Sequence, residues 1–243
     1  MLRILFFALA LLLGARPALA QDTPPDVLAR TTAQEVLTLL KNDKDIQNGN
    51  LRKIYDLVEA KVLPNFDFNR MTQLAVGKYW ASATPQQKQQ LVAEFRNLLV
   101  RTYATSLTAY SNQAVEFKPL TLRPEDDDVT VKSEIKQPGG KPISIDYSMY
   151  KTAFGWKVYD VAIDGVSLVT NYRATFASTI RQQGIDGLIH MLQTKSQQAQ
   201  GRAGNGGDAE AGGAAGAAQK KTPVNTPPAD KPRTRRPAGG ARA

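Results

Sequence analysis

The sequence has no cysteine and a single histidine among its 243 residues. Without cysteine, the chain cannot form a disulfide scaffold, a thiol nucleophile, a zinc–thiolate site or an iron–sulfur site. With one histidine it cannot form a metal site of the HExxH type, and a Ser-His-Asp triad has only His190 as its base. Most familiar catalytic arrangements are therefore disfavoured before any motif is considered.

Long hydrophobic runs are also scarce, and the one clear run lies at the N-terminus. Arg3 and the free amino group precede the apolar residues 4–13, and an Ala-Leu-Ala motif ends at Ala20. We expect residues 1–20 to be a secretory signal peptide cleaved after Ala20, which directs the mature chain to the bacterial periplasm. A transmembrane anchor is disfavoured, because a helix of about ten residues spans only about 15 Å. Gln21 is not cysteine, so the sequence does not predict a lipoprotein.

The net charge of +9 is concentrated at the two ends of the chain. Residues 199–243 hold eight Lys or Arg against three acidic residues, whereas residues 21–198 hold 21 against 19. This near-neutral middle part has no helix-turn-helix, zinc-finger or RNP pattern, so nucleic-acid binding is disfavoured. Residues 199–243 are rich in Gly, Ala, Pro and charge, with Val224 as their only large apolar residue, and we expect a disordered tail.

Helical spacing of hydrophobic residues dominates the first half of the mature chain. It predicts helices over about 26–42, 51–62, 67–82 and 84–111. The fourth begins with the clearest local signal, a capping box with proline at the first helical position, Thr84-Pro85-Gln86-Gln87. Two more helices, over about 166–183 and 185–197, are divided by Gly184.

The hydrophobic period changes from 3.6 to 2 after Asn112. Alternating residues predict four strands, near 115–117, 129–136, 143–149 and 156–163. Short connections between them favour an antiparallel meander. Strands grouped between two sets of helices indicate an α+β fold, with N- and C-terminal helices packed against a curved four-stranded antiparallel sheet. We expect one folded domain, residues 24–197.

No group of residues indicates catalysis or metal binding. The acidic run Glu125-Asp126-Asp127-Asp128 lacks the spaced ligands and the glycine of an EF-hand loop, and it is interpreted as a solvated turn. The sequence has no GxSxG motif whose serine His190 could activate, so His190 is interpreted as a surface or packed residue of the last helix. We therefore assign no catalytic residue, no metal ligand and no cofactor.

Large apolar and aromatic residues are in surplus, and the helices and the sheet are expected to direct them towards one space. Two interpretations stay open: a solid core, or an apolar cavity between a concave sheet and long helices. A slip of one residue in strand register would reverse every face. The residues predicted to line a cavity are Leu74, Tyr79, Trp80, Phe95, Leu99, Tyr103, Leu107, Ile145, Tyr147, Met149, Trp156, Val158, Val166 and Val169.

Two blocks of sequence resemble the MlaC family, also called the toluene-tolerance family. The first contains Val62-Leu63-Pro64-Asn65-Phe66-Asp67, then Leu74, Ala75, Gly77, Tyr79 and Trp80, and then Ala83-Thr84-Pro85-Gln86-Gln87. The second, more specific block contains Gly155-Trp156-Lys157-Val158-Tyr159-Asp160-Val161, Asp164-Gly165-Val166-Ser167-Leu168-Val169 and Gly184-Ile185-Asp186-Gly187-Leu188. The resemblance covers nearly the whole expected domain and leaves out the tail after Gln198.

The resemblance implies a soluble periplasmic carrier that holds a phospholipid, as cargo, by its acyl chains. It implies a nuclear-transport-factor-like architecture with the cavity between sheet and helices, and it brings no catalytic residue and no cofactor. The implied partners are an inner-membrane ABC transporter complex with a lipid-binding ring protein, and an outer-membrane lipoprotein–porin complex. The implied role is to maintain the lipid asymmetry of the outer membrane.

Two other functions stay open from the residues alone. One is a small enzyme on a similar fold, which would need a buried acid or a His–Asp pair in the pocket. Asp146 and Asp160 alternate away from the expected cavity face, which leaves only His190 to pair. The other is a structural envelope protein with a solid core and a basic tail that binds anionic lipid or peptidoglycan.

Overall fold

The computed structural model describes residues 23–104, 106–107, 113–137 and 139–204, and these residues have the expected α+β fold. The predicted signal peptide, residues 1–20, and most of the predicted tail lie outside the described residues. Among the helices that are described, none has both the length and the hydrophobicity to cross a bilayer. The last helix continues to Gly204, beyond the expected end of the domain at residue 197.

The N-terminal helices are more interrupted than their hydrophobic spacing suggests. Three α-helices come first, α1 (Pro25–Asn42), α2 (Lys44–Gln47) and α3 (Leu51–Leu57). The predicted helix over 51–62 continues from α3 as a π-helical turn, η1 (Val58–Val62), and a 3-10 turn follows, η2 (Leu63–Asn65). Pro64 has no N–H for a helical hydrogen bond, so the regular helix ends before it.

The middle helices are α4 (Phe68–Val76), the 3-10 helix η3 (Gly77–Ser82) and α5 (Pro85–Tyr103). The single helix predicted over 67–82 is wrong, because Gly77 has φ +62° and ψ −132° and ends α4. The capping box is confirmed: Gln87 N–H donates to Thr84 Oγ1 at 3.2 Å, and Thr84 N–H donates to Gln87 Oε1 at 3.0 Å. Helix α5 ends before the predicted residue 111, and residues 108–112 lie outside the described residues.

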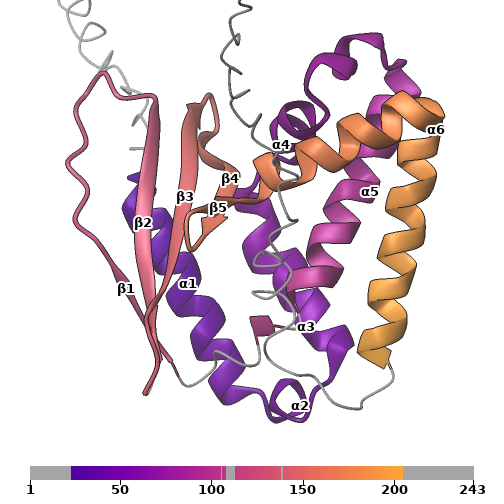
Figure 1. Ribbon diagram of the computed structural model, residues 1–243. Helices are drawn as coiled ribbons and strands as arrows, with labels where there is room; N and C mark the ends of the chain where they lie inside the picture. Colours follow the sequence, from indigo (N-terminus) through magenta and orange to yellow (C-terminus); the bar gives the residue numbers. More distant parts are fainter. Residues whose placement is uncertain (1–22, 105, 108–112, 138, 205–243) are drawn as a thin grey trace, which may run out of the picture. The chain divides into compact units, whose positions relative to one another are not determined.

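The sheet is an antiparallel meander with strand order β1-β2-β3-β4-β5 (Figure 1). The strands are β1 (Ala114–Phe117), β2 (Asp128–Lys136), β3 (Ile143–Thr152), β4 (Gly155–Ile163) and β5 (Val166–Ser167). The first four confirm the predicted strands. The fifth is a correction, because Val166 and Ser167 pair with the end of β4 where a helix start was predicted.

The last helix, α6 (Leu168–Gly204), is kinked at Gly184. The backbone there has φ 72° and ψ −175°, which is not helical, so the predicted position of the break is confirmed. Figure 1 shows that the part before the kink passes across α4 and α5, whereas the part after it runs beside α5. Together α4, α5 and α6 form a helical layer.

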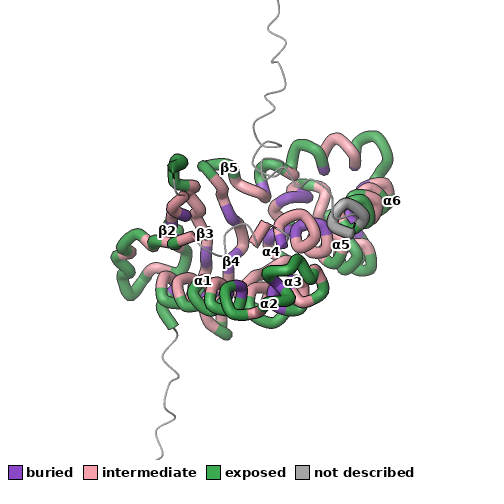
Figure 2. Tube along the Cα trace, turned by 90° about the horizontal axis from the view of Figure 1, so that it is seen from below, coloured by how far each residue is buried: buried purple, intermediate pink, exposed green. Residues whose placement is uncertain are grey.

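Three groups of buried hydrophobic residues hold these elements together. The largest lies within the helical layer, the second joins α1, α2, α3 and η1, and the third lies on the sheet. Figure 2 shows buried positions along the strands and on the inner sides of the helices. Helix α1 lies alongside the sheet and contacts β1 and β2, whereas α4 and α6 meet the sheet at β4.

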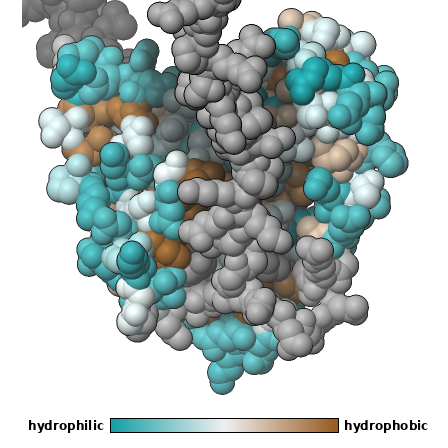
Figure 3. All heavy atoms as spheres, viewed as in Figure 1, coloured by the Kyte–Doolittle hydropathy of each residue, from teal (hydrophilic) through white to brown (hydrophobic). Residues whose placement is uncertain are grey.

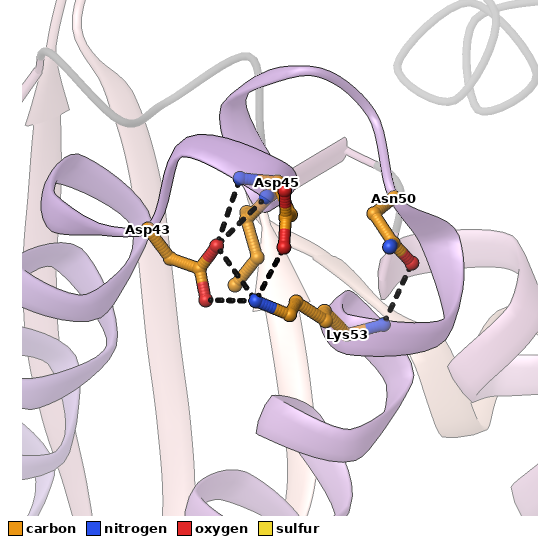
Figure 4. A network of polar contacts seen from close by, with 5 residues as sticks. Asp43, Asp45, Asn50 and Lys53 are labelled. Atoms are coloured by element: carbon orange, nitrogen blue, oxygen red, sulfur yellow. Dashed lines mark hydrogen bonds and ion pairs between the residues drawn. The ribbon is translucent and has the colours of Figure 1, made fainter.

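A polar cluster fixes the turns between α1, α2 and α3 (Figure 4). Asp43 caps α2, because its Oδ1 accepts hydrogen bonds from the N–H groups of Asp45 at 2.9 Å and Ile46 at 3.2 Å. Lys53 Nζ lies 3.0 Å from Asp43 Oδ2 and 2.7 Å from Asp45 Oδ2. Asn50 caps α3 by accepting from the Lys53 N–H at 3.3 Å. The hydrogen bond from Lys53 is the largest cause that lowers the pKa of Asp43.

We predict a pH-dependent loss of stability for Asp43→Asn. Asparagine keeps a capping oxygen but removes the charge, so the variant isolates the ion pair. The pKa of Asp43 is lower in the folded state than in the unfolded chain, so ionisation favours folding. This contribution is complete above the unfolded-state pKa and is lost as the pH falls through the folded-state pKa. The urea midpoint of the variant should be lower at pH 7 and equal to wild type in acid.

The control is Asp56→Asn, which removes an exposed carboxylate from α3. Its urea midpoint at pH 7 should lie closer to wild type than that of Asp43→Asn. A midpoint difference for Asp43→Asn that stays constant from pH 7 into acid would contradict the role assigned to the ion pair.

Candidate functional site

One face of the sheet is apolar over most of its length. The strand register places Tyr147 between Val131 and Val161, and Met149 between Val129 and Val158. Residues opposite one another on antiparallel strands share a face, so their side chains form one continuous surface. This apolar sheet face consists of Phe117, Val129, Val131, Ile145, Tyr147, Met149, Trp156, Val158, Val161 and Ile163.

A β-bulge in β4 keeps the apolar side chains on this face. The register shifts between Ser148 and Met149 of β3, so Tyr159 is an extra residue on β4. Val158, before the bulge, and Val161, after it, therefore share one face although they are three positions apart. In a strictly alternating strand, residues three positions apart point to opposite faces. The bulge thus extends the apolar surface along the whole of β4.

The apolar sheet face is covered only in part. Its buried residues are Val131, Met149, Trp156, Val158 and Val161, and the other five are half-buried. The start of α1 packs on it through Leu28 and Ala29, and Phe117 stacks on Tyr147 with ring centroids 6.3 Å apart. The guanidinium carbon of Arg30 lies 5.3 Å from the centroid of the Phe117 ring. Both rings stay half-buried, which leaves apolar area for a hydrophobic ligand to cover. Most of the described surface seen in Figure 3 is hydrophilic, with hydrophobic side chains in separate patches.

The hydroxyl of Tyr147 is a polar atom set into this face. Its polar neighbour is Ser133, whose Oγ donates to the carbonyl oxygen of Ile145 at 3.1 Å. Burial raises the pKa of Tyr147, and the neighbouring Ser133 hydroxyl opposes this shift only in part. Tyr147 is therefore neutral at physiological pH and brings no charge into the face.

Phe66 and Leu168 connect the apolar sheet face with the helical layer. Each packs against both the sheet residues and the residues buried among α4, α5 and α6. Phe66 reaches the sheet because its backbone forms a bridge with Val158. Its ring also stacks on that of Phe68, at 5.8 Å between centroids. Sheet and helical layer therefore share an apolar boundary.

Asp67 fixes this boundary with polar bonds. Its N–H donates to the carbonyl oxygen of Val158 at 2.8 Å. Its Oδ1 accepts from the N–H of Arg70 at 2.9 Å and caps α4, and its Oδ2 accepts from the hydroxyl of Tyr150. The bond to Asp67 is the largest cause that raises the pKa of Tyr150. One residue thus joins the start of α4 to β3 and β4.

The structure places the predicted cavity residues in separate groups. Half of them pack in the helical layer, namely Leu74, Tyr79, Trp80, Phe95, Leu99, Tyr103 and Val169. Phe95 is fully buried there, and the centroid of its ring lies 5.1 Å from the ring centroids of both Tyr172 and Phe176. The pKa of Tyr172 is raised to about 12. Burial is the larger cause, and the nearby Tyr103 is the smaller one. Phe95 therefore belongs to the solid core of the helical layer.

The other predicted residues divide differently. Five share the apolar sheet face, namely Ile145, Tyr147, Met149, Trp156 and Val158. Leu107 packs with α1 and α3 instead, and Val166 is 36% exposed on β5. Sequence reasoning did not select Phe66, Phe117 or Leu168, because each lies at the end of an element, where periodicity defines no face. The family-like block over 62–67 contains Phe66 and is the signal that could have indicated this region.

The residues considered for catalysis have structural contacts. Asp146 lies opposite Lys132 in the strand register, on the face opposite to the apolar one, as expected. Asp160 also lies off the apolar face and accepts hydrogen bonds from the Ser167 hydroxyl and the Val169 N–H, so it fixes the start of α6. His190 is exposed on α6. In the described part of the chain, these residues do not form a pocket centred on an acid.

The sequence matches the family model described as MlaC protein over residues 30–194. It is 26% identical over 198 residues to the intermembrane phospholipid transport system binding protein MlaC of Haemophilus influenzae, covering 80% of this chain and 92% of that protein. It is 30% identical over 191 residues to the toluene tolerance protein ttg2D of Pseudomonas putida, covering 76% of this chain and 87% of that protein. Each match spans most of both chains.

The fold is also similar to a solved structure, that of the phospholipid-binding protein from Ralstonia solanacearum in complex with a phospholipid. The TM-score is 0.69 and the sequence identity is 39%. The match covers 73% of this chain and 99% of the Ralstonia chain. The similarity therefore extends over the whole of a lipid-bound protein.

Phe95 is fully buried in the helical layer, whereas Phe117 is half-buried on the apolar sheet face. Replacing each by alanine should therefore lower the free energy of unfolding by different amounts. Phe95→Ala should lower the free energy of unfolding by about 3–5 kcal/mol, because it leaves a cavity in a fully packed core. Phe117→Ala should cost less than about half as much, because Phe117 is only half-buried. Urea unfolding at constant pH measures both values. Equal losses would show that Phe117 is packed as tightly as Phe95.

Proposed function

This chain belongs to the MlaC family, and from that premise we propose that it carries a phospholipid by its acyl chains between membrane-bound complexes. The observation that carries the proposal is the apolar sheet face, which is continuous and only partly covered. The Ralstonia protein of similar fold, which holds a phospholipid, supports the same conclusion.

The cost of moving a lipid through water explains why a carrier is needed. A phospholipid with about 30 chain methylenes loses roughly 24 kcal/mol of favourable burial on entering water, at about 0.8 kcal/mol for each methylene. Free diffusion between membranes is therefore negligible, and release has to occur while the carrier is docked. A cargo site of this kind needs apolar contacts, which is consistent with a chain that lacks catalytic motifs.

The acyl chains are proposed to lie against the apolar sheet face, from β1 to its boundary with the helical layer at β4. Ile145, Tyr147 and Phe117 offer half-buried surface there, and the neutral hydroxyl of Tyr147 adds no charge. Phe66 and Leu168 occupy the boundary itself. Fully buried residues of the helical layer, such as Phe95, are proposed to stabilise the fold without contacting the cargo.

The cellular setting is also part of the proposal. Residues 1–20 direct export, and the mature chain acts in the periplasm. It exchanges lipid with an inner-membrane ABC transporter complex that contains a lipid-binding ring protein, and with an outer-membrane lipoprotein–porin complex. The Haemophilus relative is named as part of an intermembrane phospholipid transport system, which supports partners of this kind. The result is maintenance of outer-membrane lipid asymmetry.

We further propose that the chain is not an enzyme. Asp146 and Asp160 lie off the apolar sheet face, and Asp160 is engaged at the start of α6. The phospholipid is cargo and is not a cofactor or a substrate for reaction. This proposal agrees with the transport system named for the Haemophilus relative.

Adjacent residues of β3 provide a matched test of cargo binding. Ile145 belongs to the apolar sheet face, whereas Ser144, which is equally half-buried, points to the opposite face. Wild type purified under native conditions should yield about one phospholipid per protein on organic extraction and mass analysis. Ile145→Lys should reduce this at least about tenfold, because an ammonium against acyl chains lacks a partner. Ser144→Lys should retain the lipid.

Circular dichroism of both lysine variants shows whether each is folded. A wild type without phospholipid, or two folded variants with equal lipid content, would disprove the cargo role of the apolar sheet face.

Lipid carriage is expected to be independent of the basic C-terminal segment. Helix α6 ends at Gly204, and the residues after it include almost no large apolar side chain. Deleting residues 205–243 should therefore leave the melting temperature and the lipid content unchanged. The deletion should weaken attraction to anionic vesicles at low salt, because it removes net positive charge. A loss of bound lipid on deletion would contradict this separation.

A further inference from the structure

A basic hollow of about 630 Å³ opens beside the end of α4 and the first half of α6. It is lined by Arg70, Gln73, Leu74, Gly77, Lys78 and Arg173. Half of these residues are cations and none is acidic. Arg70 packs on Tyr150, which alternates with Met149 along β3 and so faces away from the apolar sheet face. The hollow is therefore separate from the proposed cargo surface.

Local contacts hold the two guanidinium groups of the hollow in place. The guanidinium carbon of Arg70 lies 3.9 Å from the ring centroid of Tyr150 and 4.2 Å from that of Tyr159. Its Nη2 is also 3.3 Å from Asp128 Oδ2. Arg173 Nε donates to the carbonyl oxygen of Leu74 at 2.9 Å. A guanidinium has five N–H donors, so each group keeps donors for an anion.

Lys78 of the hollow and Lys88 of α5 each lie over an aromatic ring of η3. Lys78 Nζ is 5.3 Å from the ring centroid of Tyr79, and Lys88 Nζ is 5.6 Å from that of Trp80. Both rings are half-buried on η3, which starts at the positive-φ residue Gly77. Tyrosine and tryptophan with neighbouring lysines are common where a protein meets the headgroup region of a membrane.

Phe154, at the tip of the β3–β4 hairpin, is 90% exposed. The turn that displays it is well defined, because Thr152 Oγ1 donates to the Gly155 carbonyl at 2.6 Å and accepts from the Phe154 N–H at 3.1 Å. The same hairpin carries Tyr150, on which Arg70 of the hollow stacks. An exposed ring therefore stands on the hairpin that contacts Arg70 of the hollow, next to the exposed residues Asp127 and Asp128. Covering it would remove its apolar surface from water.

We propose that the basic hollow and Phe154 together form a docking surface for an anionic phospholipid membrane. Lipid phosphates bind Arg70, Lys78 and Arg173, and the Phe154 ring enters the interfacial layer. Cations beside an exposed aromatic ring match a lipid surface, which presents phosphates above an apolar layer. An acidic protein segment presents carboxylates alone and leaves the ring uncovered. This surface goes beyond cargo binding, because it brings the carrier to a membrane without using the apolar sheet face.

Binding of the full mature chain to vesicles tests the proposal. The vesicles contain phosphatidylcholine with about 30% phosphatidylglycerol, and binding is measured by co-sedimentation at low and at moderate salt. The double variant Lys78→Gln/Arg173→Gln should bind at least about fivefold more weakly than wild type. The control Lys41→Gln/Arg181→Gln removes the same charge from exposed sites elsewhere and should stay within about twofold. The basic tail is present in every variant, so its contribution cancels.

Two further variants measure how much the charge of the hollow, the shape of its side chains and the ring of Phe154 each contribute to vesicle binding. Lys78→Arg/Arg173→Lys keeps both charges and should retain vesicle binding, which also shows that the hollow tolerates substitution. Phe154→Ser leaves the charge unchanged and should reduce the part of the binding that survives moderate salt. Phospholipid content, measured on each variant in parallel, should equal that of wild type. The two measurements therefore distinguish a failure of the docking proposal from a failure of the cargo proposal.

Equal losses in the two glutamine double variants would overturn the proposal, because they would indicate unspecific attraction of a basic protein. Failure of wild type to bind the anionic vesicles would also overturn it. So would unchanged vesicle binding by Lys78→Gln/Arg173→Gln together with lost binding to a poly-glutamate peptide, which would assign the hollow to an acidic protein partner.

Discussion

At Asp67 the start of α4 is bound to two strands of the sheet at once. The backbone N–H holds Val158 of β4, one carboxylate oxygen caps α4, and the other accepts the Tyr150 hydroxyl of β3. These bonds place the preceding residue, Phe66, against the apolar sheet face, and Arg70, one turn later, against Tyr150. The position of the helical layer relative to the sheet therefore depends on Asp67, and both proposed surfaces adjoin it.

The two faces of the sheet have different chemistry because of the alternation on β3 and the bulge on β4. The alternation separates Met149 from Tyr150, and the extra residue Tyr159 keeps Val158 and Val161 together. One face is apolar and partly covered by the start of α1. The other carries Tyr150 and Tyr159, which hold Arg70 between the sheet and α4. A single strand pair thus contributes to the proposed cargo surface and to the proposed docking surface.

This separation suits a carrier whose cargo cannot enter water. A lipid must pass from one apolar environment to another without a solvated intermediate, so contact with the donor or the acceptor has to precede transfer. A charged surface acts over about a Debye length, roughly 8–10 Å at physiological ionic strength, and can orient the approach before apolar contact forms. Apolar contacts then need only shape and hydrophobicity, which explains why the apolar sheet face contains no sharp motif.

The amino-acid sequence by itself determined the features that depend on neighbouring residues. The capping box at Thr84, the kink at Gly184 and the positions of the first four strands were predictable because each arises within a few residues. Resemblance to the family indicated the function. Only the tertiary structure decided that Tyr159 is a bulge, that Phe95 lies in a solid core and that Arg70 stacks on Tyr150. A bulge exists only relative to a partner strand, and packing joins residues that are distant in the chain, so local periodicity carries no information about either.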